Sequence, residues 1–331
     1  MPRILLAPVL ALLLVGTALA DGGHQHHAAP AVPTLKNQVA TRVSVTEDAV
    51  TITFGPVDLP SPHEGELAAS LPKHIFQLPE DKYLTGYKAE VFTAEGQQLP
   101  QNFLHHILML DNDKPSVSCD GEPLFFAGAG LEMTEAKFPD GYAVKLDKTH
   151  HLMSVVAFYH KAPPTKNVMA RFTLYTAKPG AKVKEMEVYQ VGVNIVCYSQ
   201  FAQRGPDQTD EGIAVKPGVT VLSAPLKFTL DGCVKFVYPH GHDEVLLITL
   251  DNKTQNRTLL RTVPDVAMDG TFLSFLPHQV YKSGQGFPVT RQDDYEMTMV
   301  YHHPLHKANV QHGMGNYLLY MTPGGCPLDA S

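Results

Sequence analysis

Val234-Lys235-Phe236-Val237-Tyr238-Pro239-His240-Gly241-His242 is the stretch that decides the fold, and an apolar run, Val245 to Leu250, follows it directly. The first part is rich in β-branched and aromatic residues, and proline and glycine stand near its end, which is typical of a β-strand that stops at a turn. On a strand, side chains at i and i+2 point to the same face. The stretch therefore predicts a β-protein in which His240 and His242 present two imidazoles to one side of a strand end.

The same strand character continues along the chain after residue 40. Apolar and polar residues alternate over short runs, and no long amphipathic helix pattern occurs. Turns are marked at short intervals by the 26 prolines and 25 glycines. This pattern predicts an all-β sandwich or jelly-roll fold, divided into two β-sandwiches of roughly equal size. Further strands are predicted at residues 41–46, 50–54, 76–79, 83–92, 104–110, 142–146, 152–159, 171–175, 187–191, 219–222, 227–230, 258–262, 279–282, 296–301 and 317–321.

Four segments follow from the composition along the chain. Residues 1–20 join a basic start, an apolar core and an Ala-Leu-Ala ending, which indicates a secretory signal peptide cleaved after Ala20. Residues 21–40 are a predicted disordered, His-rich tail. Residues 41–190 and 191–331 are the predicted N-terminal and C-terminal β-sandwiches. We therefore expect a secreted or periplasmic protein with no transmembrane segment, because no other apolar run reaches the ~18 residues that a spanning helix needs.

Charge and cysteine content limit the classes of partner. The chain of 331 residues has a net charge of -7, which does not favour binding to nucleic acid or to an anionic membrane. Motifs of nucleotide binding, of nucleophilic hydrolysis and of zinc peptidases are missing from the sequence. In an oxidising compartment the four cysteines predict disulfide bonds, for which three pairings are possible. The sequence leaves open the substrate, whether small molecule or peptide, and the oligomeric state.

Metal binding is the chemistry that the histidines suggest most directly. The chain contains 17 histidines, and the clearest group is His240 and His242 at the predicted strand end. A later strand carries Met297, and two imidazoles with one thioether form a soft ligand set that favours copper. Met299 and His303 share a face with Met297 if that strand is regular. The alternative is that these residues are strand-end histidines and a core methionine.

A second histidine group lies in the first half of the chain. His105 and His106 are consecutive, so that on a regular strand they face opposite sides. Both can reach one metal ion only near a strand end or a bulge, or through different ring nitrogens. A third ligand must come from elsewhere, and His160 is the best placed, with His150 or His151 as the alternative.

These motifs together resemble a known family. An HH pair on an apolar strand, an isolated strand histidine, an HxH and an E-M strand follow one another as in the copper type II, ascorbate-dependent monooxygenases, which include peptidylglycine α-hydroxylating monooxygenase and dopamine β-monooxygenase. The resemblance implies an all-β fold of two tandem jelly-roll-like β-sandwich domains. It also implies two copper ions, one held by His105, His106 and a third histidine. The other would be held by His240, His242 and Met297. It also implies that ascorbate or a similar reductant reduces both ions, and that dioxygen hydroxylates a substrate at the second.

Two departures from the family pattern bear on this prediction. The family's V-H-Y stretch matches Ala157-Phe158-Tyr159-His160, so Phe158 stands at the ligand position and His160 follows two residues later. Tyr238 stands where peptide-hydroxylating members carry a basic residue, so a peptide carboxylate is not the expected substrate. The alternative functions are a non-enzymatic periplasmic or extracellular copper-binding protein and a metal-free β-sandwich interaction module.

Overall fold

The computed structural model describes residues 40–60, 69–70, 73–117, 121–158, 164–193, 208–209, 212–241, 244–268, 272–275, 280–303, 305, 311–313 and 315–326. The predicted signal peptide lies outside these residues, as does the predicted tail apart from its last residue. His160, His242, Cys119 and Cys197 also lie outside them.

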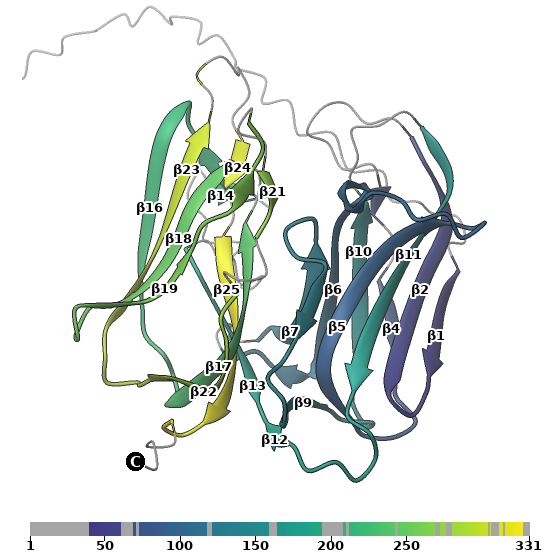
Figure 1. Cartoon of the computed structure of the whole chain (residues 1–331), viewed down its shortest axis with the longest axis horizontal. Coiled ribbons are helices and arrows are strands. Elements are labelled where there is room, and N and C mark those ends of the chain that lie inside the picture. Colours follow the sequence, from purple (N-terminus) through teal and green to yellow (C-terminus); the bar gives the residue numbers. More distant parts are fainter. Residues whose placement is uncertain are drawn as a thin grey trace, which may run out of the picture. The chain divides into compact units, whose positions relative to one another are not determined.

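Within this part of the chain the structure is built from β-strands, which confirms the predicted all-β sandwich fold (Figure 1). One short 3-10 helix, η1 (Gln101–Phe103), lies within the described ranges and precedes the strand that carries the first histidine pair. Among the described residues no helix has the length and apolar character needed to cross a membrane.

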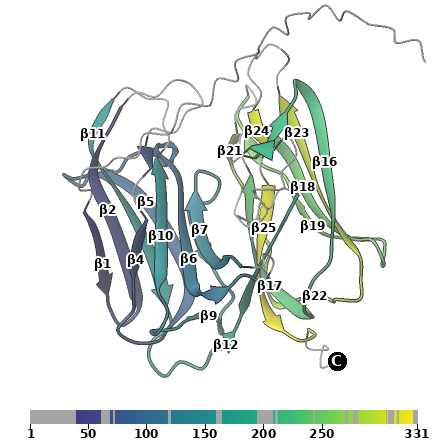
Figure 2. The same ribbon diagram turned by 180° about the vertical axis from the view of Figure 1, so that it is seen from behind.

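Two sheets that share one core form the first half. The larger sheet has the order β1 (Thr41–Val45), β2 (Ala49–Leu59), β11 (Thr165–Thr176), β5 (Lys82–Thr93), β9 (Tyr142–Leu146) and β12 (Lys184–Glu185), with β8 (Glu135–Lys137) paired to β5. The smaller sheet has the order β3 (Ala69–Ser70), β10 (Leu152–Phe158), β6 (Leu104–Pro115) and β7 (Pro123–Gly130), with β4 (His74–Phe76) paired to β10. Figure 2 shows β10 and β6 side by side in this second sheet.

The second half repeats the two-sheet plan. One sheet has the order β13 (Glu187–Gly192), β25 (Gly315–Pro323), β17 (Gly232–Gly241) and β22 (Lys282–Val289). The other has the order β16 (Gly218–Leu226), β23 (Tyr295–His303), β18 (Val245–Asn252) and β19 (Arg257–Thr262). Successive strands β16, β17 and β18 cross between the sheets, as in jelly-roll-like sandwiches. Short strands complete it: β14 (Gln208–Thr209), β15 (Gly212–Val215) and β24 (Gln311–Gly313), and the pair β20 (Asp265–Val266) and β21 (Phe272–Ser274).

Strands β17 and β25 are buried on both faces. Along β25, Leu318 and Tyr320 join the core of the first half, whereas Tyr317, Leu319 and Met321 join the core of the second half. A strand covered on both sides has no solvent-facing row, which explains why both segments are almost continuously apolar in sequence. Strand pairing changes between β12 and β13, but the first core continues onto the sheet that contains β17 and β25. The described residues of both halves belong to one compact unit.

Several details differ from or extend the sequence prediction; among them, β4 ends at Phe76 and β22 begins only at Lys282, where strands were predicted at 76–79 and 279–282. The predicted strand at 227–230 is instead the connection between β16 and β17, where Phe228 is buried. Strand β7 was not predicted, because glycine and alanine fill much of Pro123–Gly130. Cys233 and Cys326 are joined as a disulfide, with Cα atoms 4.8 Å apart, which ties β17 to the segment after β25.

Candidate metal centre

His105 and His106 lie at a bulge near the start of β6. The pairing with β10 joins His106 to Ala157 and Leu104 to Phe158, which leaves His105 as the extra residue. A bulge breaks the strict alternation of side chains along a strand. The two rings consequently lie together, with centroids 4.4 Å apart and planes inclined by 47°. The structure thus provides the local irregularity that consecutive histidines need in order to approach one ion.

His240 lies at the end of β17 and contacts a carboxylate from the first half of the chain. Its Nδ1 is 2.5 Å from Oε1 of Glu132, which belongs to the connection between β7 and β8. The hydroxyl of Tyr238 donates to the same oxygen over 3.0 Å. His240 and Tyr238 therefore face the first half, as expected for residues two apart on one strand.

The charges of His240 and Glu132 affect the pKa of His106. Burial is the main cause that lowers the pKa of His106 to about 4; the charge of nearby His240 lowers it further, and that of Glu132 opposes the shift. His106 is therefore a neutral imidazole at physiological pH, which is the form that binds metals. Burial alone would raise the pKa of Glu132, but His240 and the hydrogen bonds to the carboxylate outweigh it and lower that pKa. Burial also raises the pKa of Tyr238 well above 10, so it stays a phenol.

We call His105, His106, Glu132, Tyr238 and His240 the His–Glu cluster. It places three imidazoles and one carboxylate where β6, the end of β17 and the connection after β7 meet. Imidazoles of this kind bind copper and zinc, and a carboxylate on the second ring nitrogen is the usual outer partner of a metal-binding histidine. Within the described ranges, no three His, Cys, Asp or Glu side chains are close enough to hold a metal ion by themselves.

Met297 lies on the other side of the β17 sheet from His240. It has no exposed surface and belongs to the second core, together with Val237 of β17. Tyr238, the next residue, belongs to the first core, on the side of His240. The burial pattern of β23 also places Met299 on the Met297 face, as parity predicts. The structure thus matches the core-methionine alternative for Met297.

The strand that pairs with β17 beside His240 is β25 rather than β23. Its register joins His240 to Asn316 and Gly241 to Gly315. In the sequence, His242 follows Gly241 and Met314 precedes Gly315. Sequence reasoning missed this second methionine because pairing between strands so far apart in the chain is not visible in local patterns.

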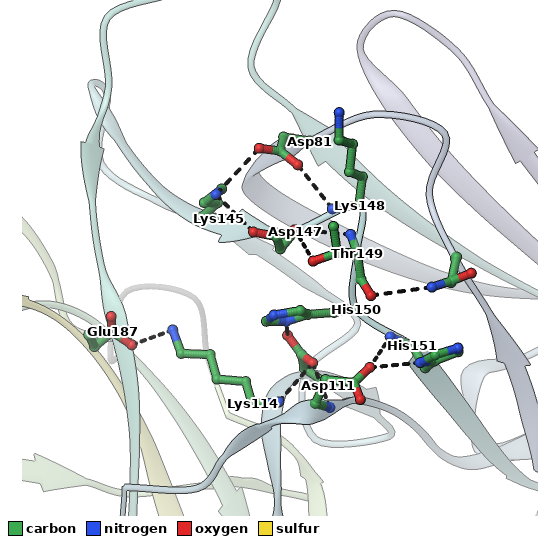
Figure 3. A network of polar contacts seen from close by, with 12 residues as sticks. Asp81, Asp111, Lys114, Lys145, Asp147, Lys148, Thr149, His150, His151 and Glu187 are labelled. Carbon is green, nitrogen blue, oxygen red and sulfur yellow. Dashed lines mark hydrogen bonds and ion pairs between the residues drawn. The ribbon is translucent and has the colours of Figure 1, made fainter.

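His150 and His151 lie at the far end of β6 from the His105–His106 pair. Figure 3 shows the rings of His150 and His151 beside the end of β6 that carries Asp111. Nδ1 of His150 is 2.8 Å from Oδ2 of Asp111, and Nδ1 of His151 is 2.8 Å from Oδ2 of Asp113. Asp111 follows His106 by five residues on β6, which corresponds to about 17 Å along a strand. Neither histidine can therefore complete a ligand set with His105 and His106.

A further carboxylate–histidine pair is buried inside the second half. Nδ1 of His303 is 2.7 Å from Oε2 of Glu244, and neither side chain is more than 7% exposed. Among the residues that the structure describes, buried Nε2 of His303 has no hydrogen-bond partner. Glu244 adopts a positive φ of 72°, and its carbonyl accepts a hydrogen bond from the His302 amide. His303 shares the inward face of β23 with Met297, away from the His–Glu cluster.

Glu132 is the site residue that the sequence did not reveal. It lies 108 positions before His240 and outside any motif, and only the packing of the two halves brings the two side chains together. A glutamate that follows the alanine- and glycine-rich end of a strand carries no local signal of this role.

Comparisons with known proteins do not identify a function for this chain. No family model matches the chain, and no curated protein matches it. Among solved structures, the chain is similar to the major capsid protein P2 from bacteriophage PM2, at 8% sequence identity and a TM-score of 0.34, covering 83% of this chain and 99% of that one. A likeness at this TM-score carries no argument about function.

Proposed function

We propose that this chain is an exported copper protein of the ascorbate-dependent monooxygenase type. The observation that carries the proposal is the bulge in β6, which brings the rings of His105 and His106 together beside Gly130, where the carboxylate of Glu132 reaches His240. Neutral imidazoles are good ligands for either oxidation state of copper. The order of these histidines along the chain is also the order that the family resemblance requires.

In this proposal, His105 and His106 hold the first copper, with His160 as the proposed third ligand. His240 and His242 hold the second copper. Copper supplies one-electron redox chemistry with dioxygen and an ascorbate-type reductant. The protein keeps His106 neutral by burial, so that its nitrogen is available at physiological pH.

For the thioether ligand we propose Met314 in place of Met297. The side chain of Met297 is sealed in the second core, on the face of the sheet opposite His240. Met314 immediately precedes Gly315, which pairs with Gly241 next to His240. We expect Met314→Leu to weaken Cu(I) binding by tenfold or more, whereas Met297→Leu leaves it unchanged. Competition against a Cu(I) chelator measures both variants.

A non-enzymatic copper-binding protein is the second candidate. The side chains of His240 and Glu132 are only 16% and 6% exposed, which leaves little open surface for a substrate beside them. A protein that only binds copper needs no such surface. A metal-free β-sandwich interaction module is the third candidate, and it requires that the full chain binds no copper.

Copper stoichiometry and oxygen uptake separate these candidates. The monooxygenase proposal predicts about two coppers per chain and ascorbate-driven oxygen consumption. It also predicts that His105→Ala/His106→Ala removes one copper and His240→Ala the other. The matched control is His150→Ala/His151→Ala, a consecutive pair at the other end of β6, which should keep both coppers. Copper without sustained oxygen consumption favours the binding protein, and no copper after loading rejects both copper proposals.

A further inference from the structure

We infer that Glu132 is the positioning residue of His240: a carboxylate from the first half of the chain fixes the imidazole of the second half so that Nε2 is the metal-binding nitrogen. This inference rests on the proposed copper function and deepens it. It makes the presentation of the second histidine group depend on the docking of the two halves.

The hydrogen bonds at one oxygen establish the direction of the interaction. Oε1 of Glu132 lies 2.5 Å from Nδ1 of His240 and 3.0 Å from the hydroxyl of Tyr238. An oxygen that receives a phenol hydroxyl acts as an acceptor, so the short contact to His240 is an N–H···O hydrogen bond from Nδ1. In a neutral ring the proton is then on Nδ1, and the lone pair is on Nε2.

The chain around Glu132 is shaped to hold this carboxylate in place. A Cβ on Gly130 would overlap Oε2 of Glu132 and would lie 2.6 Å from the carbonyl oxygen of His105. Gly130 is also the β7 residue that pairs with His106. The carboxylate therefore lies against the backbone beside the first histidine pair, in a space that only glycine leaves open.

Backbone hydrogen bonds fix the same short segment on both sides. The Phe275 amide, from the second half, donates to the Glu132 carbonyl over 2.8 Å, and the Gly130 amide donates to the Met133 carbonyl over 3.3 Å. A carboxylate on a segment held in this way loses little conformational freedom when it binds a histidine. These contacts are what a positioning residue needs, because an outer partner orients a ligand only if it is itself oriented.

Glu132→Gln tests the inference, with Glu135→Gln as the matched control. The first variant keeps the shape and removes the charge, whereas Glu135 lies on β8 with its surface exposed. Loss of an outer carboxylate typically weakens metal binding by about 10–100-fold. We expect Glu132→Gln to weaken the second copper by this factor at unchanged stoichiometry, and Glu135→Gln to match the wild type. Tyr238→Phe should give a smaller loss in the same direction, because it removes the second donor to the same oxygen.

A readout without metal distinguishes this inference from the proposed function. Nitrogen-15 NMR of metal-free protein reports which ring nitrogen of His240 carries the proton. We expect the Nδ1-protonated form in the wild type and in Glu135→Gln, and a shift toward the Nε2-protonated form in Glu132→Gln. If Glu132→Gln keeps both the wild-type tautomer and the wild-type copper affinity, the inference is wrong. If the wild type binds no copper but shows this tautomer shift, the positioning role stands and the copper function fails.

Discussion

The two ends of strand β6 each have a pair of consecutive histidines beside them, and the pairs are held in opposite ways. His105 and His106 lie on β6 itself, at a bulge, and burial lowers the pKa of His106 to about 4. His150 and His151 precede β10, and each ring lies 2.8 Å from an aspartate at the other end of β6. In our proposal the His105–His106 pair binds a metal ion, whereas the His150–His151 pair binds two aspartates and so holds a turn against β6. What surrounds a histidine pair, more than the pair itself, decides its chemistry.

The largest effect on the free energy of unfolding is expected from substitutions at the end of β6 that carries Asp111 and Asp113. Asp111 is 3% exposed, and its Oδ1 accepts the amides of Asp113 and Lys114 while Oδ2 contacts His150. Asp111→Ala leaves these donors without their acceptor, and we expect the free energy of unfolding to fall by about 2–3 kcal/mol. Asp113 is exposed, so Asp113→Ala should cost about 0.5 kcal/mol or less. Urea denaturation measures both, and equal losses would contradict a structural role centred on Asp111.

The second effect is the pH dependence of the unfolding free energy that comes from His106 at the β6 bulge. The pKa of His106 is about 4 in the folded protein and 6.5 for an ordinary histidine, so between these values the unfolded chain binds more protons. The stability linked to His106 is therefore fully present above pH 6.5 and is lost as the pH falls toward 4. We expect this part of the unfolding free energy to be on the order of 2 kcal/mol, since the ring is not fully enclosed. Urea unfolding at several pH values should show a shallower acid loss in His106→Gln, and an unchanged slope would show that the ring is not desolvated.

The smallest effect is expected at the ion pair that links the aspartate end of β6 to the second half. Nζ of Lys114 is 2.6 Å from Oε2 of Glu187 on β13, and the two side chains are 30% and 34% exposed. Partly exposed pairs contribute about 0.2–1 kcal/mol and are screened by salt. We expect Lys114→Met to lower the unfolding free energy by this amount at low ionic strength, and by less at 1 M salt. A loss that ignores salt would point to packing of the lysine stem instead.

Much of the fold could be predicted from residue patterns. Alternation predicted β1, β5 and β23, and apolar runs predicted β17 and β25, because periodicity reports burial directly. The pattern failed where side chains are too small to show it, as in β7, and where a single buried aromatic, Phe228, stands in a connection.

The site was less accessible to sequence reasoning than the fold. Parity showed that His105 and His106 need an irregular strand, but the bulge itself depends on the register with β10, a segment about fifty residues away. Parity also placed Met297 and His303 on one face, without showing that β17 separates this face from His240. Glu132 required the docking of both halves. These are long-range properties, whereas sequence patterns report local ones.

The double-sided burial of β17 and β25 has a consequence for any attempt to divide this molecule. If the C-terminal half were expressed without the N-terminal strands, it would expose an apolar surface to water, formed by Phe236, Tyr238, Leu318 and Tyr320. We expect such a fragment to self-associate or precipitate. The two halves of this chain therefore lack the independent movement that tandem domains usually have. We expect them to fold together.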